Sequence, residues 1–141
     1  MTTRTKDSTI HIDGKRVAAG LAQAGSFTTT WLFINAIGFE GITGFLVAVA
    51  VEFVLFAGKN LVLGDHAHSD AVGWAAILLD TFLNAGGLWP YITKLVKTPS
   101  WAMLVQSLQL DGTLRQIPAL VLALVFGFLL SVAPHRLCFT K

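Results

Sequence analysis

Two acidic residues interrupt stretches of sequence that are otherwise apolar. Glu52 lies seven residues before Lys59, and Asp80 lies ten residues after Asp70. If both stretches are membrane helices, a rise of about 1.5 Å per residue places the two carboxyl groups roughly 10 to 15 Å below the same membrane face. An acidic residue at that depth costs about 2.5 to 3.5 kcal/mol and usually faces a helix-bundle interior or a wet cavity. Glu52 and Asp80 are therefore candidate functional residues.

The chemistry of these two acids depends on whether they approach each other. Like charges in a poorly solvated site do not ionise together easily, so one acid is expected to keep its proton, as a proton relay requires. Alternatively, hard cations prefer carboxylate and amide oxygens. The acids could also fix helix register only, or recognise a partner helix. The predicted ion or proton path consists of Glu52, Asp80, Asn84 and Thr81.

Small and polar residues recur around both acids at helical spacing. Residues at i, i+3, i+4 and i+7 share one helix face, and small residues there allow neighbouring helices to approach closely. The last apolar stretch has no comparable stripe, so we expect it to be the most lipid-exposed helix. The stripe around Asp80 contains Gly73, Ala76, Asn84, Gly87 and Tyr91, and the stripe around Glu52 contains Gly41, Gly44, Ala48 and Lys59.

A second group of polar residues lies between two of the apolar stretches. Asp65, His66, His68 and Asp70 fall within six residues, and an extended His-x-His pair can bind a metal ion. The segment lacks the length and the cysteines of a structural zinc motif. The sequence favours a solvated loop in which Asp70 caps the next helix, with a metal site as the alternative.

The composition indicates a membrane protein. Of 141 residues, 54% are hydrophobic and 13% are charged, whereas about a quarter of a soluble domain is charged. A hydrocarbon core of about 30 Å requires roughly 20 mostly apolar residues in a helix. Three stretches meet this requirement, and a fourth, residues 17–37, is long enough but is diluted by polar side chains. We predict four spans, with three as the alternative: residues 17–37, 42–63, 71–95 and 117–133.

Shorter sequence features within and between these spans predict further details of the fold. Residues 99–111 have apolar side chains at helical spacing after a Thr-Pro-Ser start, which predicts a short amphipathic helix at the membrane surface. The residues from Gly86 to Pro90 predict a kink or an unwound turn. Trp89, Tyr91 and Trp101 are predicted interfacial anchors.

The distribution of Lys and Arg predicts the orientation of the chain. With four spans, seven of the ten basic residues, Lys59 among them, share one side, which places both termini in the cytoplasm. Three spans give the same seven-to-three division, so the charge rule does not choose between them. Residues 17–137 form one transmembrane domain between a cytoplasmic polar tail, residues 1–16, and a short tail, residues 138–141.

Several function classes are excluded by the sequence. The net charge is +2 and no basic run is present, which argues against nucleic-acid binding. Phosphate-loop, nucleophile-elbow and zinc-protease motifs are absent from the sequence, so we expect neither an enzyme nor a cofactor. We expect an all-α polytopic membrane protein whose partners are the lipid bilayer and further copies of itself or other membrane proteins. Its expected function is ion or proton movement through an oligomer, because four spans enclose little space. The alternative is a non-catalytic scaffold or accessory subunit of a larger assembly, such as a secretion or pilus machine.

Overall fold

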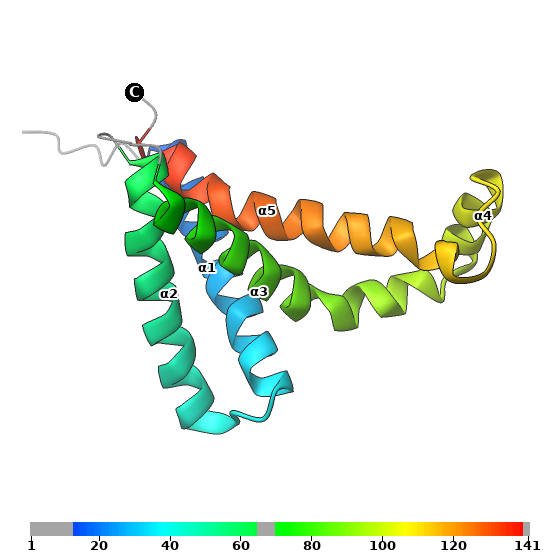
Figure 1. Ribbon diagram of the computed structural model, residues 1–141, viewed down its shortest axis with the longest axis horizontal. Coiled ribbons are helices and arrows are strands. Elements are labelled where there is room, and N and C mark those ends of the chain that lie inside the picture. Colours follow the sequence, from blue (N-terminus) through cyan, green and yellow to red (C-terminus); the bar gives the residue numbers. More distant parts are fainter. Residues whose placement is uncertain (1–12, 65–69, 140–141) are drawn as a thin grey trace, which may run out of the picture.

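A computed structural model describes residues 13–64 and 70–139, which form helices joined by short turns (Figure 1). This confirms the predicted all-α fold class for these residues. The elements are the α-helices α1 (Gly14–Ala36), α2 (Gly41–Leu63), α3 (Ala71–Val96), α4 (Pro99–Ser107) and α5 (Ile117–Phe139), with the 3-10 helix η1 (Gly112–Gln116) before α5.

The long helices form two antiparallel pairs that diverge from a shared corner (Figure 1). One pair is α1 and α2, and the other is α3 and α5, with α4 at the far end of the second pair. At the corner, the start of α1, the end of α2, the start of α3 and the end of α5 lie together. Both α3 and α5 also pack against α1 and α2. The corner is therefore the part of the molecule where all four long helices can share contacts.

Three segments are long and apolar enough to cross a membrane. They are α2, α3 and the segment Leu114–Leu137, which includes α5 up to Leu137. These segments match three of the predicted spans, so the structure fits a helical membrane protein. Helix α1 has the same 23-residue length as α2, but it is not among the three apolar segments.

Local capping explains where several helices begin. The Asp70 side chain accepts a hydrogen bond of 2.7 Å from the Val72 backbone N–H, as the predicted cap of the third span requires. Thr98 caps α4 in the same way, through a 3.4 Å bond from the Trp101 N–H. Helix α4 ends at Ser107, earlier than the predicted residue 111, because the chain then turns through Gln109 at a positive φ of 54°.

Helix α3 has no unwound turn in the segment where a kink or an unwound turn was predicted. It runs unbroken from Ala71 through Gly86, Gly87 and Pro90, and its ribbon curves in the second half (Figure 1). The two glycines also allow close packing against α1. A Cβ on Gly87 would overlap the Thr29 carbonyl of α1, so only glycine lets the two backbones meet there.

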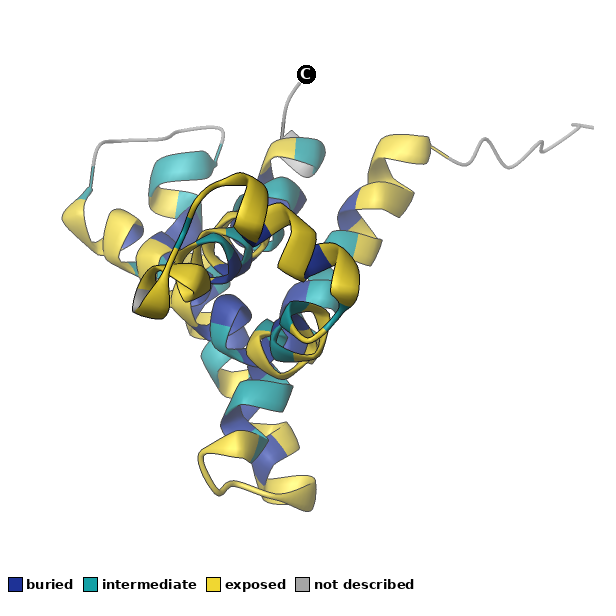
Figure 2. Cartoon of the chain, turned by 90° about the vertical axis from the view of Figure 1, so that its right-hand side faces the viewer, coloured by how far each residue is buried: buried dark blue, intermediate teal, exposed yellow. Residues whose placement is uncertain are grey.

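Helix α5 has a stripe of small residues on its buried face, so the prediction that it lacks one was wrong. The spacing of four residues places this stripe against α3 and α1, and a Cβ on Gly127 would lie 2.6 Å from the Thr81 carbonyl. The share of buried residues is 28% in the α5 segment and 22% in α2, so α2 is the more exposed of the two. The outer faces of the helices are largely exposed (Figure 2). The buried stripe of α5 consists of Ala119, Ala123, Gly127, Ser131 and His135.

Candidate functional site

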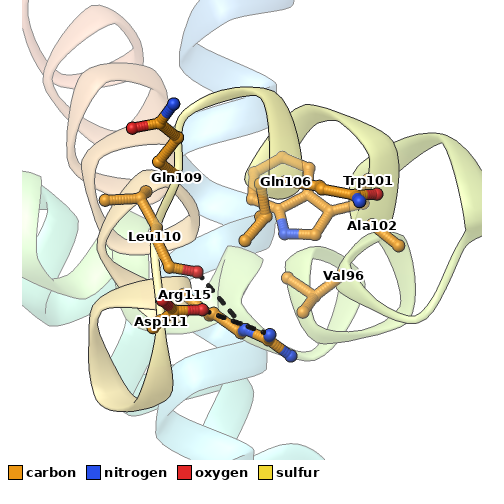
Figure 3. Close-up of a pocket in the computed structure, with 9 residues that line it drawn as sticks. Val96, Trp101, Ala102, Gln106, Gln109, Leu110, Asp111 and Arg115 are labelled. Carbon is orange, nitrogen blue, oxygen red and sulfur yellow. Dashed lines mark hydrogen bonds and ion pairs between the residues drawn. The ribbon is translucent and has the colours of Figure 1, made fainter.

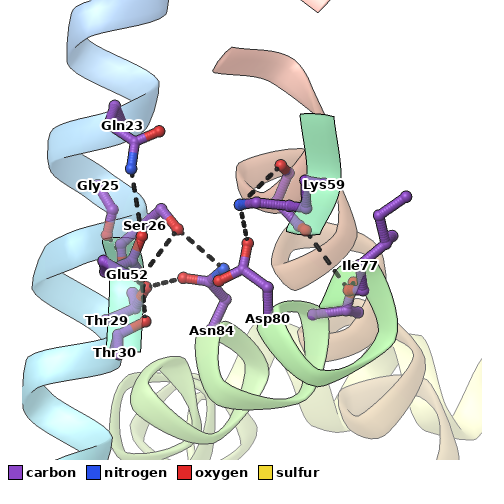
Figure 4. A network of polar contacts seen from close by, with 12 residues as sticks. Gln23, Gly25, Ser26, Thr29, Thr30, Glu52, Lys59, Ile77, Asp80 and Asn84 are labelled. Atoms are coloured by element: carbon purple, nitrogen blue, oxygen red, sulfur yellow. Dashed lines mark hydrogen bonds and ion pairs between the residues drawn. The ribbon is translucent and has the colours of Figure 1, made fainter. Parts of the chain in front are cut away.

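A buried ion pair links α2 and α3 near the shared corner (Figure 4). The Lys59 Nζ lies 2.5 Å from the Asp80 Oδ2, and both side chains are fully buried, with 0% exposure. Lys59 also donates a 3.3 Å hydrogen bond to the Ser131 carbonyl of α5. Lys59 of α2 therefore contacts both α3 and α5.

The position of Lys59 corrects an expectation from the sequence. Lys59 was counted among the basic residues that flank the membrane, but its side chain points into the bundle. Lys59 points inward because it follows Glu52 by seven residues, or two helical turns, and therefore lies on the same side of α2. Lys59 therefore provides no information about orientation, and it belongs to the candidate site.

Glu52 is surrounded by polar side chains of α1. Its Oε1 accepts hydrogen bonds from the Thr30 hydroxyl at 2.6 Å and the Ser26 hydroxyl at 3.4 Å. Its Oε2 accepts a bond of 3.2 Å from the Gln23 amide. The Glu52 side chain is 6% exposed. Within the described residues, Glu52 therefore has only neutral hydrogen-bond donors and no ion-pair partner.

Asn84 connects these contacts to α3. Its Nδ2 donates a 3.1 Å hydrogen bond to the Ser26 Oγ, and its Oδ1 accepts a bond from the Thr29 hydroxyl. Asn84 follows Asp80 by four residues, so both side chains project from one face of α3. The two acids thus belong to one cluster, but each carboxylate has its own hydrogen-bond partners. We call this set the polar cluster; its members are Gln23, Ser26, Thr29, Thr30, Glu52, Lys59, Asp80 and Asn84.

Three of the four predicted path residues lie in the polar cluster. Thr81 is buried beside it, but its hydroxyl donates to the Ile77 carbonyl of the same helix at 2.7 Å. The sequence placed Lys59 on the helix face of Glu52, but Lys59 was not included among the predicted path residues. The four residues contributed by α1 were missed, although a signal for them existed. The polar residues that weakened the first predicted span also recur at helical spacing.

The donors around the acids disfavour a cation held jointly by Glu52 and Asp80. Asp80 is already compensated by Lys59, and the Glu52 oxygens accept three hydrogen bonds. With both acids ionised and Lys59 charged, the formal charges of the polar cluster sum to −1. Placing an isolated charge in a low-dielectric interior is costly, so this arrangement favours binding of a proton or a compensating cation at Glu52.

A groove between α1 and α2 leads to Glu52. Its volume is about 530 Å³. Gln23 lines it, and the Gln23 Oε1 is buried without a hydrogen-bond partner among the described residues, while Nε2 points to Glu52 (Figure 4). The groove thus combines apolar walls with two polar side chains. It is lined by Gly20, Gln23, Ala24, Phe27, Val49, Glu52, Phe53 and Phe56.

A second cavity of about 470 Å³ lies between the end of α3, α4, the turn before η1 and Arg115 of η1 (Figure 3). Arg115 lines it, donating to the Leu110 carbonyl at 3.3 Å and pairing with Asp111 at 3.6 Å. Trp101 is 8% exposed and packs in a cluster with Ile92 of α3 and Ala119 of α5. It therefore packs α4 against the other helices.

The remaining predicted aromatic anchors are accessible. Trp89 and Tyr91 are 37% and 55% exposed near the end of α3. The Lys94 Nζ lies 5.9 Å from the centre of the Tyr91 ring. Exposure of this kind is compatible with the predicted interfacial role of both residues.

Most of the predicted metal loop lies outside the described residues, namely Asp65, His66 and His68. Asp70 is described, and its carboxylate caps α3. In residues 13–64 and 70–139, no group of three or more His, Cys, Asp or Glu side chains is placed to hold a metal ion.

Comparisons of the chain with models of protein families, with curated proteins and with solved structures find no match. The geometry of the polar cluster is therefore the basis for a functional proposal.

Proposed function

We propose that the chain is an integral membrane protein with four spanning helices that moves protons through the polar cluster and works as an oligomer. The observation that carries this proposal is the environment of Glu52. This acid is buried within an apolar helix, has neutral hydrogen-bond donors, and is linked through Ser26 and Asn84 to the helix face that holds Asp80.

The contacts of α1 support a fourth span. Glu52 lies in the middle of α2, and Gln23, Ser26 and Thr30 donate to it from the middle of α1. Two helices that share these contacts lie at the same depth. Four of the polar side chains that lower the hydropathy of α1, those of Gln23, Ser26, Thr29 and Thr30, face the polar cluster, whereas Thr28 is exposed.

The proposed path runs from the groove toward the shared corner. Glu52 and Lys59 are seven residues apart on α2, a distance of about 10 Å along the helix axis. Glu52 would accept the proton, and the Asp80–Lys59 pair would pass it to the corner. Because an amide does not readily transfer protons, passage from Ser26 to Asp80 requires a water molecule beside Asn84 or a rotation of that side chain.

An oligomer is part of the proposal because the groove lies at the side of a single chain. Symmetry-related copies would shield this entrance from lipid and supply further walls to the path. The exposed apolar outer faces provide surface for such contacts.

Proton flux in liposomes tests this function. We would reconstitute the full chain with a pH-sensitive dye inside the vesicles and drive proton entry with a potassium-diffusion potential. Glu52→Gln retains the shape of the side chain and one acceptor oxygen but cannot titrate, so it should reduce flux at least tenfold. Glu40→Gln is the control, because Glu40 is exposed at the start of α2. Wild-type vesicles as tight as protein-free ones would refute proton movement.

A scaffold function is the second candidate, and the connection of three helices through Ser26 favours it. Here the polar cluster would fix the packing of a non-catalytic accessory subunit of a larger assembly. The same variants separate the candidates. Loss of oligomer or partner association in Glu52→Gln, without wild-type flux, would support the scaffold.

A further inference from the structure

We infer that the groove between α1 and α2 binds a lipophilic organic cation, with its positive charge beside Glu52. The inference goes beyond proton movement because it assigns a ligand class to the groove. It shares the groove and Glu52 with the proposed path, but it does not depend on proton movement.

Charge complementarity identifies the ligand class. Lys59 compensates Asp80 at 2.5 Å, whereas Glu52 has no cationic partner among the residues that the structure describes. Glu52 lines the groove, so an ionised Glu52 would favour a cation in this cavity over an anion or a neutral molecule.

The walls of the groove select an apolar cation. Phe27, Phe53 and Phe56 line it from both helices, and aromatic faces attract organic cations as well as apolar groups. A metal ion would need more oxygen ligands than Glu52 and Gln23 offer. A bulky quaternary cation needs none, because its charge is spread over a surface that is itself apolar.

Gln23 provides a second polar feature. Its Nε2 is held by Glu52, which fixes the amide, and its buried Oε1 has no hydrogen-bond partner in the described part of the chain. The volume of about 530 Å³ is within the range of small-molecule sites.

Two ions of the same shape and opposite charge test the inference. Binding of tetraphenylphosphonium and tetraphenylborate to the detergent-purified full chain would be measured by titration calorimetry. Saturable binding of the phosphonium, at least tenfold tighter than that of the borate, is expected. Equal binding of both ions would overturn the inference, because an apolar groove filled by any hydrophobic group gives that result.

Variants then locate the site. Glu52→Gln should weaken phosphonium binding at least tenfold, while Glu40→Gln should leave it unchanged. Ala24→Phe fills the groove and retains Glu52, so it should also abolish binding. Its control is Ala18→Phe, an exposed position on the same helix that does not line the groove. Unchanged affinity in Ala24→Phe would refute the assignment even if Glu52→Gln fails to fold.

The outcome is separable from that of the proposed function. Proton flux without phosphonium binding would refute the ligand site and retain proton movement. Phosphonium binding without proton flux would refute proton movement and retain the ligand site.

Discussion

Lys59 and Asp80 face each other across the contact between α2 and α3, with 2.5 Å between Nζ and Oδ2 and no exposure of either side chain. Of these two residues, only Asp80 was among the path residues predicted from the sequence. Lys59 was placed on the stripe of Glu52 but was counted as a residue of the membrane flank. The pair changes how variants at either position are interpreted, because neutralising one member leaves the other buried and unpaired.

The ion pair predicts strong coupling between substitutions. Lys59→Met or Asp80→Asn alone should lower the free energy of unfolding by about 3 to 5 kcal/mol, the usual result of leaving one buried charge without its partner. The double variant should lose less than the sum by more than about 1 kcal/mol. Unfolding in detergent, followed by circular dichroism, measures both quantities.

The control for this cycle is the exposed pair Arg16 and Asp13, whose atoms lie 3.8 Å apart. Arg16→Gln should change the free energy of unfolding by less than about 1 kcal/mol. Additive effects of the Lys59 and Asp80 substitutions would show that the pair does not form in the folded protein.

The crossing of α1 and α3 gives a second prediction. Gly87→Ala places a Cβ against the Thr29 carbonyl, a backbone atom that cannot move without its helix. The helices must separate, so we expect a loss of stability of about 1 to 3 kcal/mol from overpacking. Gly20→Ala is the matched control, because its Cβ meets nothing within 4 Å and alanine is the better helix former. Equal melting temperatures for the two variants would contradict this crossing geometry.

The features predicted from the sequence are those with local causes. Long apolar runs indicate α2, α3 and α5 because a membrane helix must satisfy its own backbone. Asp70 and Thr98 were identified as capping candidates because a cap involves residues two or three positions apart.

The features that were missed depend on partners distant in the sequence. Lys59 lies four residues before the end of α2, close enough to reach outward to the membrane surface, and only Asp80 on another helix makes the inward direction favourable. Ala123 and Gly127 were counted as ordinary apolar residues of α5. Their role in packing depends on the approach of α3, which the α5 sequence does not encode.

The burial of Trp101 predicts that it docks α4. Trp101→Ala removes the largest side chain between α4 and the bundle, a change that typically costs about 3 to 5 kcal/mol at a buried site. Because α4 lies at the end of the molecule, we expect local release of this helix and an intact polar cluster.

Hydrogen exchange measures this release. In Trp101→Ala, exchange should accelerate in α4 and remain slow in α2. Trp74→Ala, at a position 49% exposed, should leave exchange in α4 unchanged. Uniform acceleration across all helices in Trp101→Ala would contradict local docking.

The hydrogen bonds from α1 to Glu52 predict that α1 crosses the membrane with α2. Single cysteines at Lys15, Glu40, Ala71 and Ser107, in a background with Cys138→Ser, would be labelled with a membrane-impermeant reagent from each side. With four spans, the cysteines at Lys15 and Ala71 should react from one side, and those at Glu40 and Ser107 from the other. The orientation predicted from the basic residues places Lys15 on the cytoplasmic side. Labelling at Lys15 and Glu40 from the same side would remove α1 from the membrane. That result would also be incompatible with its contacts to Glu52, because a carboxylate in the middle of a spanning α2 cannot be reached by a helix that lies at the surface.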